Sequence, residues 1–323
     1  MFGWSILEFA KMGVYWGAWL LIPAGAALAL AAHRMRGARR AAALIAMAPV
    51  AVLGYARFIE PRILLTVAHH TTLERCFADS GSARLAVFSD PHQGIFANAA
   101  GMSRIARRVN AAAPDAVFIA GDLVYFLDPA RFAETFDALR VIGAPVYAVL
   151  GNHDLGLPGP DVSDPLAKAL EAAGVRVIDD RTQTLLVRGR TIEIVGISDL
   201  WAKKQELTRL SRASARPRVA LTHNPETILH LNPERPVDLM LAGHTHGGQI
   251  YIPFLTCRLL AFACKVTRYG FADAPAGRVF VTSGTGMVGL PMRLGAPPRI
   301  DVVTAAWREC PRRGAPAESK QFY

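Results

Sequence analysis

The feature that most constrains this chain is an uncharged apolar run near its N-terminus, from Met12 to Ala32. At about 20 residues, the run matches the length that a helix needs to cross the hydrocarbon core of a bilayer. A second uncharged run, from Ala41 to Ala56, has about the minimum spanning length and contains Pro49. We therefore predict two transmembrane helices, at about 12–32 and 41–56, in a membrane anchor that covers residues 1–57.

The loop between the two runs is rich in arginine, with Arg34, Arg36, Arg39 and Arg40 close together. Such loops stay on the cytoplasmic side, so the helices would form a hairpin in a bacterial inner membrane with the rest of the chain facing the periplasm. The alternative is a cleaved signal peptide, because Lys11 precedes an apolar stretch that ends in small residues. The second run argues against cleavage, since the mature chain would then begin with an unburied hydrophobic segment.

Beyond a linker expected at 58–82, short apolar runs alternate with helical stretches, which is typical of layered α/β folds. Helices are expected at about 103–113 and 129–140, and another begins at Ser163 and ends before Gly174. We predict two mixed β-sheets packed face to face with helices outside, in a domain at 83–308, and a mobile tail at 309–323. The expected strands are 85–88, 116–120, 146–150, 176–178, 184–187, 191–195, 219–222, 239–242 and 279–282.

Residue types that bind metals follow five of these strands, at the point where each strand ends. In an open α/β layer the loops at those ends line one crevice. Imidazole and carboxylate groups are common ligands of Zn, Fe and Mn, and one Asp can bridge two ions. A single Asp-x-His or His-x-His is more often a surface turn or a hydrogen-bonded core histidine. Five such loops together predict a metal cage built from Asp90, His92, Asp122, Asn152, His223, His244 and His246.

The formal net charge of +10 would suit a surface that meets anionic phosphates. No basic run is interleaved with aromatic residues, however, as binding of single-stranded nucleic acid would require. Much of the excess is arginine scattered on polar faces, so nucleic acid is not expected as a partner. The membrane is expected as a partner because of the two apolar runs.

The four cysteines, Cys76, Cys257, Cys264 and Cys310, include no C-x-x-C pair, which argues against a Cys-based zinc site. Their even number permits disulfides in an oxidising compartment, with Cys257 and Cys264 closest in sequence. Buried free thiols are equally compatible with the sequence.

Gly284, Gly286 and Gly289 fit the G-x-G-x-x-G pattern of dinucleotide-binding folds. Leu290 and Pro291 interrupt any helix after them, and too little chain remains for the required βαβ unit. We predict a tight loop near the metal site instead.

Taken in order, these motifs resemble the calcineurin-like metallophosphoesterase superfamily. The matching segments are D-x-H at 90–92, G-D at 121–122, G-N-H-D at 151–154, the lone His223 and G-H-T-H-G-G-Q at 243–249. Segments 248–253 and 283–286, with Pro291, Arg293 and 297–298, resemble its membrane-associated branch. That branch includes transmembrane proteins with a metallophosphoesterase domain and UDP-diacylglucosamine pyrophosphatase-like enzymes. Pro91 and Arg299 depart from the family pattern without replacing a ligand.

The resemblance implies a four-layer sandwich that holds two divalent ions, Mn²⁺, Fe²⁺/Fe³⁺ or Zn²⁺. His153 would be a non-ligand histidine that stabilises phosphoryl charge or protonates the leaving oxygen, and Asp154 would orient it. One ion would take Asp90, His92, Asp122 and His246, and the other Asp122, Asn152, His223 and His244.

The resemblance also implies hydrolysis of a phosphodiester or pyrophosphate bond by direct attack of a metal-bridging hydroxide. Together with the anchor, it predicts a lipid-linked or nucleotide-lipid substrate such as UDP-2,3-diacylglucosamine. That nucleotide lipid is cytoplasmic, which conflicts with a periplasmic domain. Two alternatives stay open: a catalytically inactive, membrane-tethered binding protein, and a nuclease or nucleotidase of the same superfamily.

Overall fold

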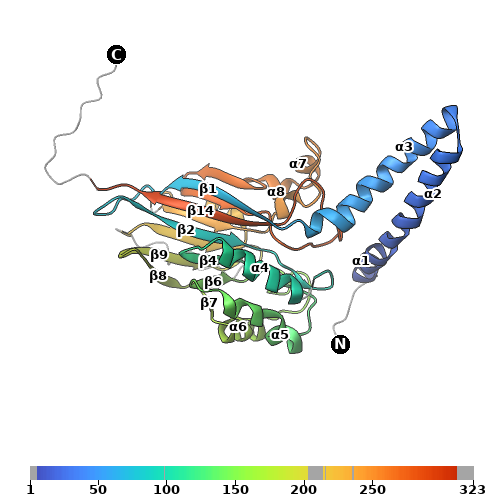
Figure 1. Ribbon diagram of the computed structural model, residues 1–323. Coiled ribbons are helices and arrows are strands. Elements are labelled where there is room, and N and C mark those ends of the chain that lie inside the picture. The colour runs from blue at the N-terminus through green and yellow to red at the C-terminus, as the bar shows by residue number, and fades with distance from the viewer. Residues whose placement is uncertain (1–5, 98, 203–213, 215, 235, 311–323) are drawn as a thin grey trace, which may run out of the picture.

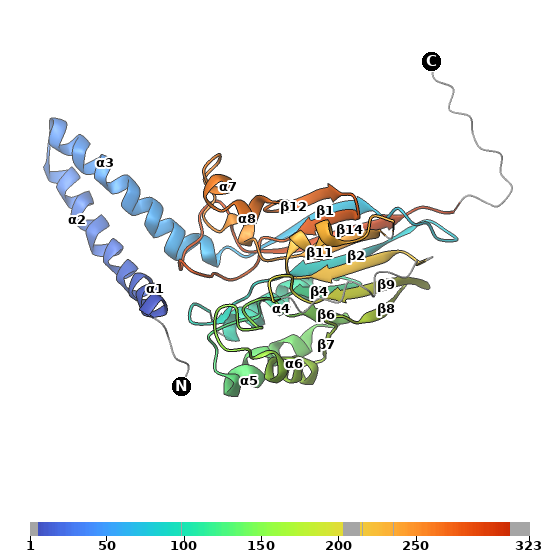
Figure 2. The ribbon, with the colours of Figure 1, turned by 180° about the vertical axis from the view of Figure 1, so that it is seen from behind.

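Two six-stranded sheets form the centre of the computed structural model, which describes residues 6–97, 99–202, 214, 216–234 and 236–310 (Figure 1). The sheets lie face to face, and a helical hairpin leaves the domain at one end, as the view from behind also shows (Figure 2). The predicted fold class is therefore confirmed.

The first sheet has a parallel centre of short apolar strands, which is usual where helices and a second sheet cover both faces. Strand β14 (Arg299–Trp307) runs antiparallel to β2 and parallel to the edge strand β1 (Leu65–Thr72). The parallel strands are β2 (Gly81–Phe88), β4 (Ala116–Ala120), β6 (Val146–Val149) and β7 (Val175–Val177).

The second sheet also has a parallel centre, but both of its edge strands are antiparallel to their neighbours. A hairpin turn at Arg188 and Gly189, whose φ angles are 49° and 75°, joins two of its strands, β8 (Thr182–Val187) and β9 (Arg190–Ile197). Its strands, in spatial order, are β12 (Gly270–Ala274), β13 (Gly277–Val281), β11 (Val237–Ala242), β10 (Arg218–Thr222), β9 (Arg190–Ile197) and β8 (Thr182–Val187). A small separate ladder joins β3 (Gln93–Gly94) to β5 (Val124–Tyr125).

Helices and apolar clusters complete the layers. One core lies between the sheets, and a second lies under the helices α4 (Ala99–Ala111), α5 (Phe132–Phe136) and α6 (Ser163–Ala172). The short 3₁₀ helix η7 (Pro225–His230) contacts β11 and β13 at the outer face of the second sheet. The helix expected at 129–140 is divided into η4 (Pro129–Arg131), α5 and η5 (Asp137–Val141).

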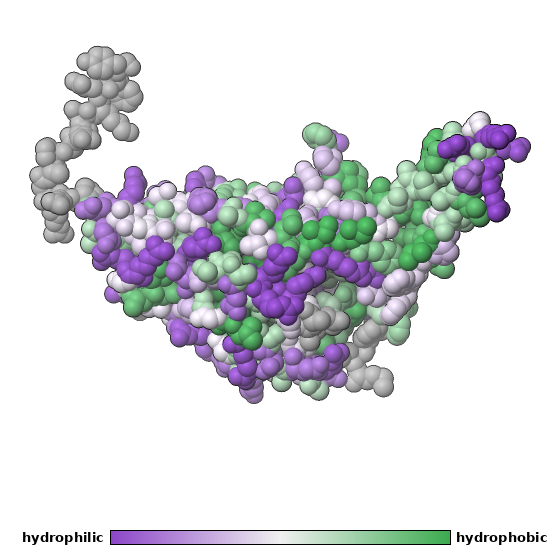
Figure 3. Space-filling view, in the orientation of Figure 1, coloured by the Kyte–Doolittle hydropathy of each residue, from purple (hydrophilic) through white to green (hydrophobic). Residues whose placement is uncertain are grey.

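Two N-terminal segments, Ile6–Arg34 and Gly37–Arg62, are long and apolar enough to cross a membrane. The first segment contains α1 (Ile6–Gly17), η1 (Ala18–Leu20) and α2 (Leu21–Arg34). The second contains α3 (Gly37–Gly54) and ends in a π-helical turn, η2 (Tyr55–Ile59), and a 3₁₀ turn, η3 (Glu60–Arg62). The space-filling view shows hydrophobic surface along the hairpin and a hydrophilic group at its far tip, where α2 turns into α3 (Figure 3).

The base of the hairpin is bonded to the domain. Glu60 accepts the backbone N–H groups of Gly295 and Ala296 at 3.0 and 2.7 Å. On α1, the Lys11 ammonium donates to the Tyr125 hydroxyl at 2.7 Å. The hairpin is therefore packed against the sandwich and is not a free tether.

Residues 58–82 were expected to be a linker. In the structure this segment instead contains β1, which belongs to the first sheet because it pairs with β14. Side chains of β1 alternate only weakly in burial, as at an edge strand that is held mainly by its backbone. The expected tail begins later than predicted, since Glu309 bridges Phe77 and Cys310 forms a disulfide with Cys76. The rest of that tail, 311–323, lies outside the described residues.

Candidate metal centre

Strand register brings the five predicted loops together. Phe88 pairs with Ile119, and Ile119 pairs with Ala148, so β2, β4 and β6 end at the same edge of their sheet. In the second sheet Leu221 pairs with Leu241, which aligns the ends of β10 and β11. The candidate ligands begin one to a few residues beyond these strand ends.

One group of side chains gathers around Asp90 and Asp122. His246 Nε2 lies 3.3 Å from Asp90 Oδ1 and 3.1 Å from His92 Nε2. His92 Nε2 lies 3.5 Å from Asp122 Oδ2. Atoms this close, all of them ligand types, are able to hold one cation between them.

A second group shares Asp122. His223 Nε2 lies 3.2 Å from Asp122 Oδ2, and His244 Nδ1 lies 3.1 Å from His223 Nε2. The other ring nitrogen of His223 is 2.7 Å from the Ala120 carbonyl, which fixes the ring and favours a lone pair on Nε2. Asp122 therefore stands between the two groups.

Asn152 and His153 border the same space. Asn152 Nδ2 donates to the Leu157 carbonyl at 2.6 Å, and its Oδ1 is buried without a hydrogen-bond partner. His153 Nε2 lies 4.0 Å from Asp122 Oδ2, and its side chain is slightly exposed. The structure thus brings all seven predicted ligands and His153 to one end of the sandwich.

The buried ligand atoms are short of partners. Asp90 Oδ1 and Asn152 Oδ1 accept no hydrogen bond among the described residues. Buried polar atoms are rarely left unpaired unless something else satisfies them. A cation bound between these oxygen atoms and the neighbouring imidazole rings would satisfy them.

The charge states of four site residues fit the same reading. Burial lowers the pKa of His92 and of His244 to about 3, so both rings are neutral and keep a lone pair for a metal. Burial raises the pKa of Asp122, but the imidazoles of His223 and His153 outweigh it and hold this pKa well below its usual range. Burial raises the pKa of Asp90 to about 7, and a cation beside it would restore the ionised form. His223 differs: burial lowers its pKa, but the Asp122 carboxylate outweighs burial and raises this pKa well above its usual range, so the ring would have to release a proton to bind a cation.

The backbone of the site is strained. Non-glycine residues rarely adopt positive φ, and they do so mainly where surrounding structure enforces it. Here five candidate ligands have φ between 43° and 71°: Asp90, His92, Asp122, His244 and His246.

Two glycines allow the loops to approach each other. Gly121 has a φ of 80°, and a Cβ there would lie 2.8 Å from the backbone nitrogen of Gly151 and from His223 Nδ1. A Cβ on Gly151 would collide with the Asp122 side chain. The G-D and G-N-H-D motifs therefore need glycine because their loops touch.

Asp154 does not orient His153 as expected. Its buried carboxylate accepts the N–H groups of Leu123, Val124 and Gly151 at 3.0–3.1 Å and forms no hydrogen bond to the His153 ring. The residue instead ties the loop after β4 to the loop after β6. This is a correction: both carboxylate oxygens turn to backbone N–H groups instead of to the His153 ring.

Asp199 and Trp201 were not predicted. Asp199 is buried after β9 and accepts N–H groups of Trp201 and Ala202. The Trp201 ring lies edge-on to His244, with centroids 4.3 Å apart. Asp199 has the strand-end position that identified the other residues, so the same pattern could have found it.

The G-x-G-x-x-G segment is a tight loop beside the site, as predicted. Thr285 N–H donates to the Ser89 carbonyl at 2.9 Å, and Gly286 N–H donates to the Asp90 carbonyl at 2.7 Å. This loop supports the backbone around Asp90. The described residues show no dinucleotide-binding βαβ unit at this position.

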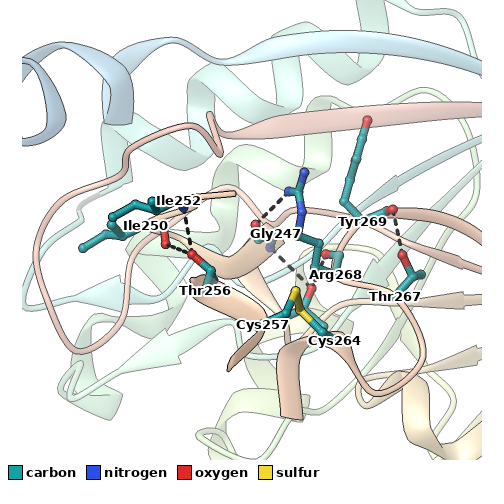
Figure 4. The surroundings of a disulfide bond; sticks show 10 residues. Gly247, Ile250, Ile252, Thr256, Cys257, Cys264, Thr267, Arg268 and Tyr269 are labelled. Carbon is teal, nitrogen blue, oxygen red and sulfur yellow. Dashed lines mark hydrogen bonds between the residues drawn. A yellow bond between two sulfur atoms is a disulfide. The ribbon is translucent and has the colours of Figure 1, made fainter. Parts of the chain in front are cut away.

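An apolar cavity of about 370 Å³ opens beside the metal-binding groups. One wall comes from the loop after β11, where helices α7 (Thr256–Leu259) and α8 (Ala261–Cys264) are joined by the Cys257–Cys264 disulfide (Figure 4). Arg268 donates to the Gly247 carbonyl at 3.0 Å and fixes this loop to the H-T-H-G-G segment. The apolar lining includes Trp201, Ile250, Leu260, Phe262, Val288 and Leu290.

Comparison with known proteins agrees with the geometry. The calcineurin-like phosphoesterase model matches residues 83–248. The uncharacterized metallophosphoesterase YkuE of Bacillus subtilis is 32% identical over 78% of this chain and 88% of its own length. The phosphodiesterase YaeI of Escherichia coli is 30% identical over 62% of this chain and 74% of its own. The UDP-2,3-diacylglucosamine pyrophosphatase LpxG of Chlamydia trachomatis is 25% identical over 65% and 77%. The chain belongs to the calcineurin-like phosphoesterase family of metal-dependent hydrolases.

Proposed function

We propose that this protein is a membrane-anchored phosphoesterase that hydrolyses a phosphodiester or pyrophosphate bond in an amphiphilic substrate. The observation that carries the proposal is the apolar cavity that shares Asp122, Asn152, His153, His244 and His246 with the metal-binding groups. A cavity with this lining accepts an acyl or prenyl chain while the phosphate meets the polar floor.

Seven residues are assigned to two ions, with Asp122 as the bridge. Bound divalent ions would activate water and neutralise phosphoryl charge. The unpartnered oxygens of Asp90 and Asn152 support this assignment. The first ion is assigned to Asp90, His92, Asp122 and His246, and the second to Asp122, Asn152, His223 and His244.

His153 is assigned to the phosphoryl or leaving oxygen. Its ring lines the cavity, and its Nδ1 has no hydrogen-bond partner among the described residues. An N–H of this ring stabilises negative charge on the leaving oxygen or supplies its proton. Asp154 positions His153 only indirectly, through the loop that carries both residues.

We place the catalytic domain on the outer side of a bacterial inner membrane. The arginine-rich turn at the far end of the hairpin favours the cytoplasm. The disulfides Cys76–Cys310 and Cys257–Cys264 favour an oxidising compartment for the domain. This placement favours a lipid-linked phosphate ester of the outer leaflet over a cytoplasmic nucleotide lipid.

The membrane side is tested by joining alkaline phosphatase after Arg62. The enzyme is active only when it is exported, so colonies with the fusion should show activity. A fusion that is inactive, while the same fusion of β-galactosidase is active, would reverse the orientation. Reversal would make the nucleotide lipid the favoured substrate.

The chemistry is tested on the purified full chain loaded with Mn²⁺, Fe²⁺ or Zn²⁺ in turn. Hydrolysis of bis-p-nitrophenyl phosphate should exceed that of p-nitrophenyl phosphate and of single-stranded DNA. Asp122→Ala removes the bridge, and turnover should fall about 1,000-fold or more. Asp137→Ala removes a carboxylate in an exposed ion pair and should leave turnover unchanged. Retained activity in Asp122→Ala would show that the site is wrong.

Substrate class is tested with p-nitrophenyl octyl phosphate. The wild type should prefer it to bis-p-nitrophenyl phosphate, and Leu260→Ser should reduce that preference about 3- to 10-fold through less favourable burial of the chain. Leu186→Ser, a matched change at an exposed leucine of β8, should leave the preference intact. If the wild type and both variants preferred p-nitrophenyl octyl phosphate to the same degree, the proposal of an amphiphilic substrate would be contradicted.

A further inference from the structure

A second cavity, of about 480 Å³, lies where the hairpin joins the domain. Its lining includes Arg57 and Arg62 from the base of the hairpin and Arg104 and Arg107 from α4. None of the described lining residues is Asp or Glu. The cavity therefore combines four cationic side chains with no carboxylate in its wall.

Arg57 is a buried cation that has no carboxylate partner among the described residues. Its side chain is buried, with the residue 3% exposed, and its guanidinium lies 3.9 Å from the centroid of the Tyr15 ring. One nitrogen donates to the Tyr15 carbonyl at 3.3 Å, whereas Nε has no partner, and no carboxylate among the described residues pairs with it. A buried cation without a counter-charge is unfavourable, so an anionic ligand would stabilise it.

Other groups in the wall complete a binding site. Arg104 donates to the Arg62 carbonyl at 3.2 Å, which holds these two residues together. Gln93 is buried, and its Oε1 has no partner, so it is able to accept a hydroxyl. The cavity also adjoins Gly101 near the start of α4, where helix N–H groups favour negative charge.

The position of the cavity along the length of the hairpin indicates which kind of molecule would supply the anion. Between the arginine-rich tip and the Tyr15–Arg57 contact, each arm of the hairpin has about 20 residues, the thickness of one hydrocarbon core. The cavity therefore lies at the phosphate level of the leaflet next to the domain. The space-filling view shows hydrophilic surface beside the base of the hairpin at α4 (Figure 3).

We propose that this cavity binds the phosphate of an anionic phospholipid headgroup, with Arg57, Arg62, Arg104 and Arg107 around the phosphate and Gln93 accepting a headgroup hydroxyl. None of the seven candidate metal ligands lines this cavity, although Pro91 and Gln93 in its wall flank His92. Its lipid source rests on the membrane anchoring proposed above, whereas its chemistry, a bound phosphate anion, does not.

The test measures binding of fluorescent dioctanoyl phosphatidylglycerol to the full chain in a neutral detergent. Dioctanoyl phosphatidylcholine, inorganic phosphate and glycerol 3-phosphate serve as competitors. Arg104→Gln/Arg107→Gln removes two charges from the cavity. Arg108→Gln/Arg131→Gln removes two from exposed positions that do not line it. Hydrolysis of bis-p-nitrophenyl phosphate by each protein reports an intact metal centre.

The cavity double variant should bind the probe about 10-fold more weakly or worse, since hydrogen bonds to charged groups are lost. The control double variant should stay within about 2-fold, and all proteins should hydrolyse the reporter equally. Equal binding by both variants would overturn the proposal. Displacement by inorganic phosphate as effective as by the lipid would reject the lipid source. If the double variant lost reporter activity, Arg107→Gln alone, at an exposed side chain, would decide in its place.

Discussion

Replacing Asp154 by Ala removes one buried carboxylate that serves three backbone donors. The N–H groups of Leu123, Val124 and Gly151 donate to it at 3.1, 3.0 and 3.0 Å. A buried donor left without an acceptor costs about 1–3 kcal/mol. Even at the lower end of this range, the three together lower the free energy of unfolding by about 3 kcal/mol. The expected drop in Tm is then about 6–12 °C for a domain of this size.

The same variant separates two roles for Asp154. If the residue positions loops, Asp154→Ala lowers Tm, and activity falls because the Asp122 and Asn152 loops shift. His153→Ala, one residue away and at a slightly exposed side chain, should lower activity about 100-fold or more with Tm nearly unchanged. Thermal unfolding and hydrolysis of bis-p-nitrophenyl phosphate are measured on both. An Asp154→Ala protein that keeps its Tm but loses activity as His153→Ala does would refute the positioning role.

Three further predictions follow from the geometry. Gly121→Ala should abolish activity, measured with bis-p-nitrophenyl phosphate, because its Cβ would meet Gly151 and His223. Chelation should lower Tm by an amount that grows with the metal affinity, and readdition of Mn²⁺ should restore it. Burial raises the pKa of Asp179 to about 7, so its contribution to stability is full below pH 4 and is lost as pH rises through 7. Asp179→Asn should therefore reduce the decline of Tm between pH 5 and 8.

The clustering of the candidate metal ligands could be predicted because the information is local. Each loop carries its own signal, a buried strand followed by glycine and a ligand-type residue, and parallel strands bring such loops together. Asp154 shows the limit of the method. A carboxylate next to His153 in sequence looks like its partner, but in the structure it turns to three N–H groups that come partly from another loop.

Strand β1 could not be predicted because its sequence, LTVAHHTT, lacks an apolar alternation. An edge strand is held by its backbone ladder, and its partner β14 lies more than 200 residues further along the chain, with Leu65 opposite Arg299. Local patterns carry no information about such pairings. The disulfide between Cys76 and Cys310 links the segments that follow these two strands. Its pairing could not be predicted from the sequence for the same reason.

The contact between anchor and domain changes what the hairpin is for. A tether requires only length and hydrophobicity, yet Lys11 on α1 bonds to Tyr125, and the Tyr125 ring lies edge-on to both His92 and His153. Glu60 accepts the Ala296 N–H and so fixes the other arm to the loop before β14. Because both arms are bonded to loops around the site, a hairpin that spans a membrane, as proposed above, would hold the candidate metal centre and its apolar cavity at a fixed height beside the bilayer. The proposed amphiphilic substrate would then reach the site without leaving the membrane completely, which a flexible linker would not ensure.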